Sequence, residues 1–121
     1  MKVFKLNNAS LYGTIIEKGN SNNIKYFKFS DGTLIMSGIY NTGTITFGNA
    51  NAKTVTFPIK FKDTSYFVGL TKSSGGSYGF SNINDSVTKY VSNFVATHWC
   101  PANVSRVDPI DYCWMAIGEW K

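Results

Sequence analysis

The sequence predicts an all-β domain, an antiparallel β-sandwich of about eight or nine short strands. Short runs rich in β-branched and aromatic residues recur along the chain, separated by Gly, Asn, Asp and Ser. No helical periodicity extends beyond one turn, which argues against packed helices. The last run, Ile110–Trp120, is apolar almost without a break from Tyr112 to Ile117, as in a strand buried on both faces.

Side chains alternate across this final strand. One face would carry Cys113, Met115 and Ile117, and the other Tyr112, Trp114 and Ala116. Such a strand needs a cover on each face, so the upstream residues are expected to supply both covers.

The 121 residues suit one compact domain. The segment Lys18–Asn23 is rich in residues that favour turns. It therefore predicts a boundary, with an N-terminal arm over residues 1–22 and the sandwich over residues 23–121.

The clearest hairpin comes next. Ile24–Phe29 and Thr33–Met36 are strand-like runs on either side of the pair Asp31–Gly32. An Asp-Gly pair in this position predicts a type I′ turn, which needs positive φ at both central residues. A short run over Thr44–Phe47 then alternates with threonine, so one of its faces is expected to be wet.

Three further strands are expected before the last one. Thr54–Phe61 alternates, but Pro58 within it cannot donate to a ladder, so this strand lies at an edge or breaks there. Ser65–Thr71 would turn alternate apolar residues inward. Val87–Thr97 is apolar on both faces and is expected to be central, next to the final strand.

The charge pattern bears on partners. The net charge is +5, but the lysines are scattered singly and Arg106 is the one arginine, whereas nucleic-acid modules cluster basic residues. No apolar run reaches about 18 residues, and the N-terminus has no apolar signal core. We therefore expect no nucleic-acid partner, no membrane insertion and no signal peptide.

The sequence does not predict an enzyme. Ser-His-Asp catalysis would need the single histidine, His98, with Asp108 or Asp111, and no nucleophile-elbow pattern is present. His98 and Cys100 could join Cys113 around a zinc ion, but a loop histidine beside free thiols is the favoured interpretation. We expect no catalytic residues, no metal and no cofactor.

Aromatic residues are the remaining feature, and several fall in loops or at strand ends. An aromatic ring covers the apolar C–H face of a sugar while fixed polar groups bind its hydroxyls. The same rings could instead cap the core or fill a subunit interface.

Four segments resemble a known family in their order and spacing. They are the turn region Glu17–Asn22 leading to Tyr26–Thr33, then Val55–Phe61, then Tyr66–Val68, then Tyr112–Gly118. Over about residues 17 to 118 the chain resembles the C-terminal tip domain of bacteriophage tail fibres, which also occurs in prophages and tail-derived particles.

The resemblance implies a β-sandwich tip that assembles as a parallel homotrimer, with residues 1–22 as an arm or the end of the fibre shaft. It implies attachment to host cell-surface polysaccharide without catalysis, as part of a virion that leaves its host by lysis. The matching motifs are structural, so they transfer no sugar-binding residue.

Loop placement and residue type supply the candidate glycan contacts instead. Specificity is expected in the loops Tyr40–Asn51, Ser73–Asp85 and Trp99–Asp108. The candidates are Tyr78, Phe80, Trp99, Arg106 and Asp108. Tyr78 or Phe80 could also fold back to pin its loop. The alternative functions are a structural trimerisation cap of the fibre and a free-standing carbohydrate-binding, lectin-like module.

Overall fold

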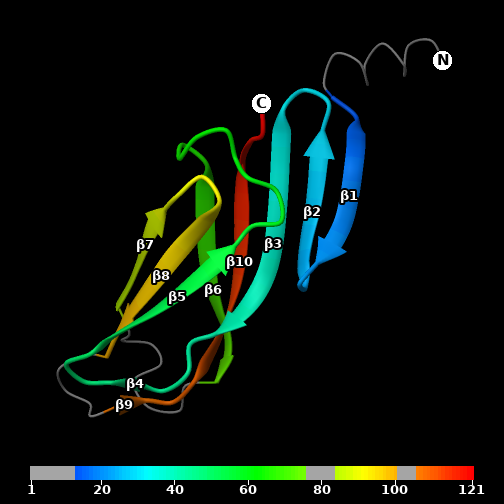
Figure 1. Cartoon of the computed structure of the whole chain (residues 1–121). Helices are drawn as coiled ribbons and strands as arrows, with labels where there is room; N and C mark the ends of the chain where they lie inside the picture. Colours follow the sequence, from blue (N-terminus) through cyan, green and yellow to red (C-terminus); the bar gives the residue numbers. More distant parts are fainter. Residues whose placement is uncertain (1–12, 76–83, 101–105) are drawn as a thin grey trace, which may run out of the picture.

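The computed structural model describes residues 13–75, 84–100 and 106–121, and within them the chain is all-β without helix. The strands are β1 (Ile15–Ser21), β2 (Ile24–Phe29), β3 (Thr33–Asn41), β4 (Ile45–Thr46), β5 (Ala50–Thr56), β6 (Phe67–Gly75), β7 (Asn84–Lys89), β8 (Asn93–Trp99), β9 (Arg106–Val107) and β10 (Ile110–Glu119). The predicted all-β class and antiparallel sandwich are confirmed (Figure 1).

Two sheets form the layers of the sandwich. The larger has the strand order β1-β2-β3-β10-β6, and the smaller has the order β5-β8-β7. Every pairing between these strands is antiparallel. β4 and β9 form a separate two-stranded ladder at one end of the molecule (Figure 1).

The final strand β10 lies between β3 and β6, as the centre of its own sheet. Trp114 pairs with Gly38 on β3 and with Leu70 on β6. The predicted final strand is therefore confirmed, but its predicted neighbour is wrong, because β8 lies in the opposite layer. An apolar run marks a buried strand, yet it does not show which strand lies beside it.

The two faces of β10 differ. Its inward residues pack into the core, where Tyr112, Trp114 and Ala116 are at most 3% exposed. On the other face, Met115 is 45% and Ile117 38% exposed, and no other described element of the chain covers them. The rest of the chain is expected from the sequence to cover both faces of β10. The described residues cover only the face that bears Trp114.

We call this uncovered surface of the five-stranded sheet the outer face. Register and alternation place on it the polar residues Lys25, Ser37 and Thr71 and seven apolar residues: Phe27, Ile35, Ile39, Phe67, Cys113, Met115 and Ile117. A row of four of them crosses the sheet from strand to strand, because Phe27 pairs with Ile35, Ile35 with Ile117, and Ile117 with Phe67.

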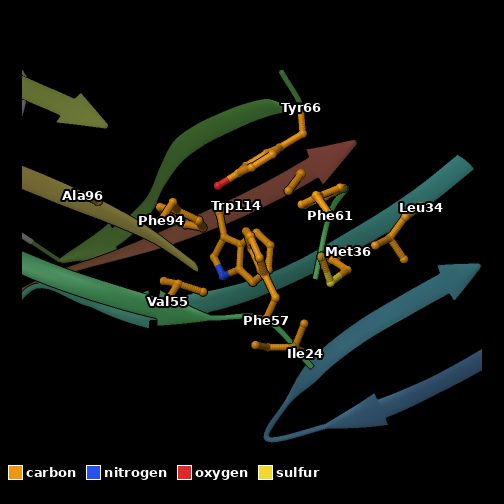
Figure 2. Packing of buried hydrophobic residues seen from close by; sticks show 11 residues of the cluster. Ile24, Leu34, Met36, Val55, Phe57, Phe61, Tyr66, Phe94, Ala96 and Trp114 are labelled. Carbon is orange, nitrogen blue, oxygen red and sulfur yellow. The ribbon is translucent and has the colours of Figure 1, made fainter. Parts of the chain in front are cut away.

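Aromatic rings fill the space between the two sheets. The buried cluster consists of Ile24, Leu34, Met36, Val55, Phe57, Phe61, Tyr66, Phe94, Ala96, Trp114 and Ala116 (Figure 2). Phe61 and Tyr66 stack with ring centroids 4.1 Å apart, and Phe94 meets Trp114 edge-on at 5.3 Å. The segment after β5 thus contributes rings to the core although it is not a strand.

The predicted first hairpin is confirmed, but its turn type is not. Gly32 has a φ of 103°, whereas Asp31 has negative φ, so the turn differs from the predicted type I′ turn. The Asp31 carboxylate accepts a hydrogen bond from the backbone N–H of Thr33 at 2.9 Å. The type I′ conformation occurs instead between β1 and β2, where Asn22 and Asn23 have φ values of 52° and 63°.

Two predicted strands have different limits. The run Thr54–Phe61 stops being a strand at Thr56, just before Pro58, and β5 is an edge strand. The predicted single strand Val87–Thr97 is wrong: it is the hairpin of β7 and β8, which turns at Tyr90–Asn93. Because apolar residues lie on both sides of a short turn, no sequence pattern indicates that the chain reverses direction there.

The predicted domain boundary between residues 22 and 23 falls in the turn between β1 and β2. β1 pairs with β2 from Ile15 to Ser21, so this part of the predicted arm lies in the sheet. Within the described residues, no helix has the length and apolarity needed to cross a membrane.

Candidate functional site

Several strands begin or end at one end of the sandwich, which we call the loop end. It contains the ends of β3, β6 and β8, the starts of β7 and β10, and the ladder of β4 with β9 (Figure 1). The pairing register requires this meeting, because Asn41 pairs with Asp111, Asp111 with Ser74, and Trp99 with both Ala50 and Asn84.

The chain joins the sheet at the opposite end. Ile15 of β1 pairs with Phe29, beside the turn from which Thr33 begins β3, and Thr33 pairs with Glu119. The loop end therefore lies at the opposite end of the strands from Ile15, where β1 begins (Figure 1).

A second apolar cluster supports the loop end from beneath. It consists of Ile45, Cys100, Val107, Ile110 and Tyr112. Cys100 is 5% exposed, and the others are at most 1% exposed. This cluster fixes the short β4–β9 ladder, which two paired residues on each strand could not hold alone.

Polar side chains fix the turn after β3. Thr42 is fully buried, and its hydroxyl accepts a hydrogen bond from the backbone N–H of Ile110 at 3.1 Å. The Asn51 side chain donates to the carbonyl of Thr42 at 2.6 Å. The segment around Gly43 is thus tied to β5 and β10, and its path is rigid.

Asp111 links three strands at this end. Its carboxylate accepts a hydrogen bond from Asn41 at 2.7 Å and from Ser74 at 3.0 Å. These hydrogen bonds hold the pKa of the Asp111 carboxyl below its usual range, Asn41 making the largest contribution. The residue therefore carries a negative charge near neutral pH and serves as a bridge between β3, β10 and β6.

A partly buried polar network lies between the two sheets at the loop end. The Tyr112 hydroxyl donates to Oδ1 of Asp85 at 2.8 Å, and Nδ1 of His98 lies 2.8 Å from the same oxygen. On the far side of the ring, Nε2 lies 3.0 Å from the Tyr40 hydroxyl. Because a carboxylate only accepts, Nδ1 carries the hydrogen, and in the neutral ring Nε2 accepts from Tyr40.

Both tyrosine hydroxyls in this network stay protonated at neutral pH. Burial raises the pKa of Tyr40, and the charge of Asp85 raises it further. Burial also raises the pKa of Tyr112, with the hydrogen bond to Asp85 as the next cause. The network thus joins β3 and β10 to β7 and β8, with Tyr112 and His98 both bound to one oxygen of Asp85.

The predicted candidate Trp99 is exposed at the loop end. It is the last residue of β8, directly after the buried His98, and its side chain is 45% exposed. Phe47 forms a bridge to Cys100, and it is 53% exposed. Both rings are thus exposed at the loop end, on segments that the bridge between Phe47 and Cys100 brings together.

Arg106 and Asp108 also lie at the loop end. Nε of Arg106 is 3.3 Å from Oδ1 of Asp108, and their side chains are 59% and 35% exposed. Thr46 pairs with Arg106, and the same segment continues through Phe47. The segment from β4 to β5 therefore brings the Arg106–Asp108 ion pair and Trp99 to one end of the molecule.

The other two predicted candidates, Tyr78 and Phe80, lie outside the described residues. The strands that flank them end at Gly75 and begin at Asn84, both at the loop end. Phe47 was not among the candidates, although it lies in the predicted loop Tyr40–Asn51. Its position before Gly48, at the end of a short alternating run, was the available signal.

The arrangement around His98 differs from a catalytic one. Its partner is Asp85, whereas Asp108 pairs with Arg106 and Asp111 with Asn41 and Ser74. His98 has no exposed surface, and both ring nitrogens have partners within the fold. Its ring therefore positions strands and is closed to a substrate in solution.

The three residues considered for zinc are also separated. Neither cysteine forms a disulfide; Cys100 is buried in the second apolar cluster, and Cys113 lies on the outer face. Within the described parts of the chain, no group of three His, Cys, Asp or Glu side chains is placed to hold a metal ion.

A protein-family model matches residues 28–119, and it describes the C-terminal part of putative gp53-like tail fibre proteins. Among curated proteins, none is significantly similar to the chain.

Two solved structures share the fold. An N-truncated R1-type pyocin tail fibre has a TM-score of 0.62 at 17% identity, over 98% of this chain and 96% of that chain. A longer C-terminal piece of the R1 pyocin fibre of P. aeruginosa has a TM-score of 0.60 at 17% identity, over 98% of this chain. The match spans 31% of that longer piece.

Proposed function

Because this chain belongs to the family of gp53-like tail fibre C-terminal domains, we propose that it is a distal receptor-binding domain that attaches a tail fibre to host-surface polysaccharide. In this proposal it binds without catalysing a reaction, and three copies assemble side by side at the end of the fibre. The loop end points outward, away from the shaft.

The observation that carries the proposal is the opposition of the two ends. Among the described residues the sheet begins at Ile15 of β1, and β8, which ends with Trp99, ends at the far end of the molecule (Figure 1). A shaft that continues toward the N-terminus would leave the loop end as the part that meets another surface first.

The residues at the loop end have the chemistry that sugars require. Trp99 and Phe47 present exposed rings for C–H faces, and Arg106 and Asp108 present polar groups at their border. The segments beneath these rings are held by hydrogen bonds to the backbone. The Thr42 hydroxyl accepts from the N–H of Ile110, and the Asn51 side chain donates to the carbonyl of Thr42. A rigid platform keeps the entropy cost of binding a flexible polysaccharide low.

The non-catalytic part of the proposal is supported by the carboxylates. Asp85 is engaged by His98 and Tyr112, and Asp111 by Asn41 and Ser74. Glycoside hydrolysis needs one carboxyl to donate a proton and a second to attack or activate water. Among the described residues, these two loop-end acids have structural partners instead.

The test uses the labelled full chain on a panel of bacterial strains and on derivatives of these strains that lack surface polysaccharide. Trp99→Ala should weaken binding roughly tenfold, because a stacked ring is lost. Tyr90→Ala is the matched control: Tyr90 is 51% exposed but lies at the other end of the β7–β8 hairpin. Equal binding of both variants, or undiminished binding to cells without polysaccharide, contradicts the proposal.

A structural trimerisation cap is the second candidate, and the outer face favours it. This surface carries apolar residues that no described element of the chain covers. A cap would assemble but would bind no strain of the panel, so the same experiment separates the two candidates.

A further inference from the structure

We propose that the outer face is the surface on which neighbouring copies of this chain meet in the fibre tip. The inference rests on the assembly included in the proposed function and adds which surface performs it. The occupant is a second copy of the chain, seated over β3, β10 and β6.

The sequence of β10 is apolar on both faces of the strand. Its run from Tyr112 to Ile117 has no polar alternation, which is typical of strands covered on both faces. The core covers only the face that bears Trp114. The residues Met115 and Ile117 on the other face would be expected to be polar if water were their permanent neighbour.

The outer face exposes a large apolar area. On the outer face Ile39 is 66%, Phe67 62%, Met115 45%, Ile117 38% and Phe27 37% exposed. At about 200 Å² for a large apolar residue, these fractions amount to roughly 500 Å².

A monomeric protein rarely exposes more than a few hundred Å² of contiguous apolar surface. A standard interface buries about 800 Å² on each partner, of which about 60% is apolar. The outer face thus carries about the apolar area that one partner contributes to such an interface.

The outer face is not flat but hollowed. A groove of about 890 Å³ crosses the outer face, with Gly38, Gly69, Cys113 and Met115 among its lining residues. Ile39 at its wall and Phe67 nearby are the most exposed large residues of this face. A surface with both a hollow and protruding apolar side chains can interdigitate with a copy of itself, whereas a flat sheet cannot.

Charge distribution agrees with this occupant. Between Asp111 and Glu119, which lie toward the two ends of β10, the described outer-face residues of β3, β10 and β6 are uncharged, although Ser37 and Thr71 among them are polar. Lys18 and Lys25 lie on β1 and β2, and Lys25 lines the groove. An uncharged centre with a charged border is the usual anatomy of a protein–protein interface.

The test replaces exposed residues that make no contribution to the core. Ile39→Glu and Met115→Glu place a charge on the outer face, where an interface would bury it without a partner. Thr54→Glu is the matched control, because it adds the same charge to the exposed side of β5 in the other sheet. The mass of each full chain is measured by light scattering over a wide concentration range, and circular dichroism checks the fold.

The proposal expects the wild type and Thr54→Glu to assemble as trimers of the 13.4 kDa chain. Ile39→Glu and Met115→Glu should be folded and should associate roughly a hundredfold or more weakly. Cys113 supplies an independent readout, since a maleimide should label it slowly in the assembled wild type and rapidly in Ile39→Glu. Cys100, which is buried in the second apolar cluster, should react slowly in both proteins.

Three results would overturn the inference. Trimers of Ile39→Glu and Met115→Glu with a reactive Cys113 would place the interface elsewhere and leave the proposed function standing. A monomeric wild type with a reactive Cys113 would remove the assembly as well. A monomeric wild type with a protected Cys113 would show that another part of the same chain covers the outer face. Binding to cells is measured separately, so loss of the interface is not mistaken for loss of the receptor site.

Discussion

Replacing His98 with alanine should be among the most destabilising substitutions in this domain. The ring is fully buried, and it stacks on Tyr112 with a centroid distance of 4.6 Å. Its removal deletes the contacts to Asp85 and Tyr40 and leaves a void between the sheets. Asp85 keeps the hydrogen bond from Tyr112, but the Tyr40 hydroxyl loses its partner in a half-buried position.

The magnitude follows from these losses. Truncating a large buried ring costs about 3 kcal/mol through lost contacts and the cavity. Leaving one buried hydroxyl without a partner adds about 1 kcal/mol. The total of about 4 kcal/mol corresponds to a fall in Tm of about 16 °C, at about 4 °C per kcal/mol for a domain of this length.

The assay is thermal unfolding followed by circular dichroism, at one protein concentration for all variants because association alters Tm. A double-mutant cycle with Tyr40→Phe isolates the hydrogen bond. Tyr40→Phe should cost about 1 kcal/mol in the wild type. In the His98→Ala background it should cost nothing, because the hydroxyl has already lost its partner. A Tm within 4 °C of the wild type for His98→Ala, or additive effects in the cycle, would refute the reasoning.

Three other perturbations address the scaffold, each measured by unfolding. Gly118→Ala should cost about 1–3 kcal/mol, because a Cβ there would lie 2.5 Å from that of Tyr66; an unchanged Tm would contradict this. Asn23→Val should cost about 1–2 kcal/mol at a φ of 63°, whereas Asn23→Gly should differ from the wild type by less than about 0.5 kcal/mol. Asp31 and Asp111 have folded pKa values below the ordinary 3.8, so the stability they supply is present above that pH and is lost below it. Acid titration of Asp31→Asn should therefore show a shallower loss of stability.

The fold class could be predicted from the sequence because local patterns determine it. The hairpin of β2 and β3 and the strand β10 have alternation, turn residues and apolar runs that are visible in a single segment. Strand adjacency could not be predicted in this way. β10 pairs with β3 and β6, from which it is separated by many residues, and apolarity does not encode the choice.

The hairpin of β7 and β8 was predicted as one strand for a related reason. Its turn at Tyr90–Asn93 contains neither Gly nor Pro, so the usual turn signal was absent. The reversal is visible only in the pairing of the two strands, in which Lys89 lies opposite Phe94. Local sequence carries little information on such a pairing.

The common location of three candidate residues could be predicted, but the contacts that support them could not, and their role in binding stays a prediction. Loop placement led to Trp99, Arg106 and Asp108, and all three lie at the loop end. The partner of His98 was not predictable, because Asp85 reaches it only through the register of β7 with β8. The uncovered outer face could not be predicted either. An apolar strand face has the same sequence pattern whether the same chain or a second copy covers it.

Hydrogen–deuterium exchange of the full chain tests the central claim most directly. It would be measured with and without polysaccharide purified from a panel strain that the chain binds. We expect added protection at the loop end, over residues 45–51 and 106–108, and none at the β7–β8 turn around Tyr90. Protection confined to the outer face or to the opposite end, with residues 45–51 and 106–108 unchanged, would contradict the claim that the loop end holds the receptor.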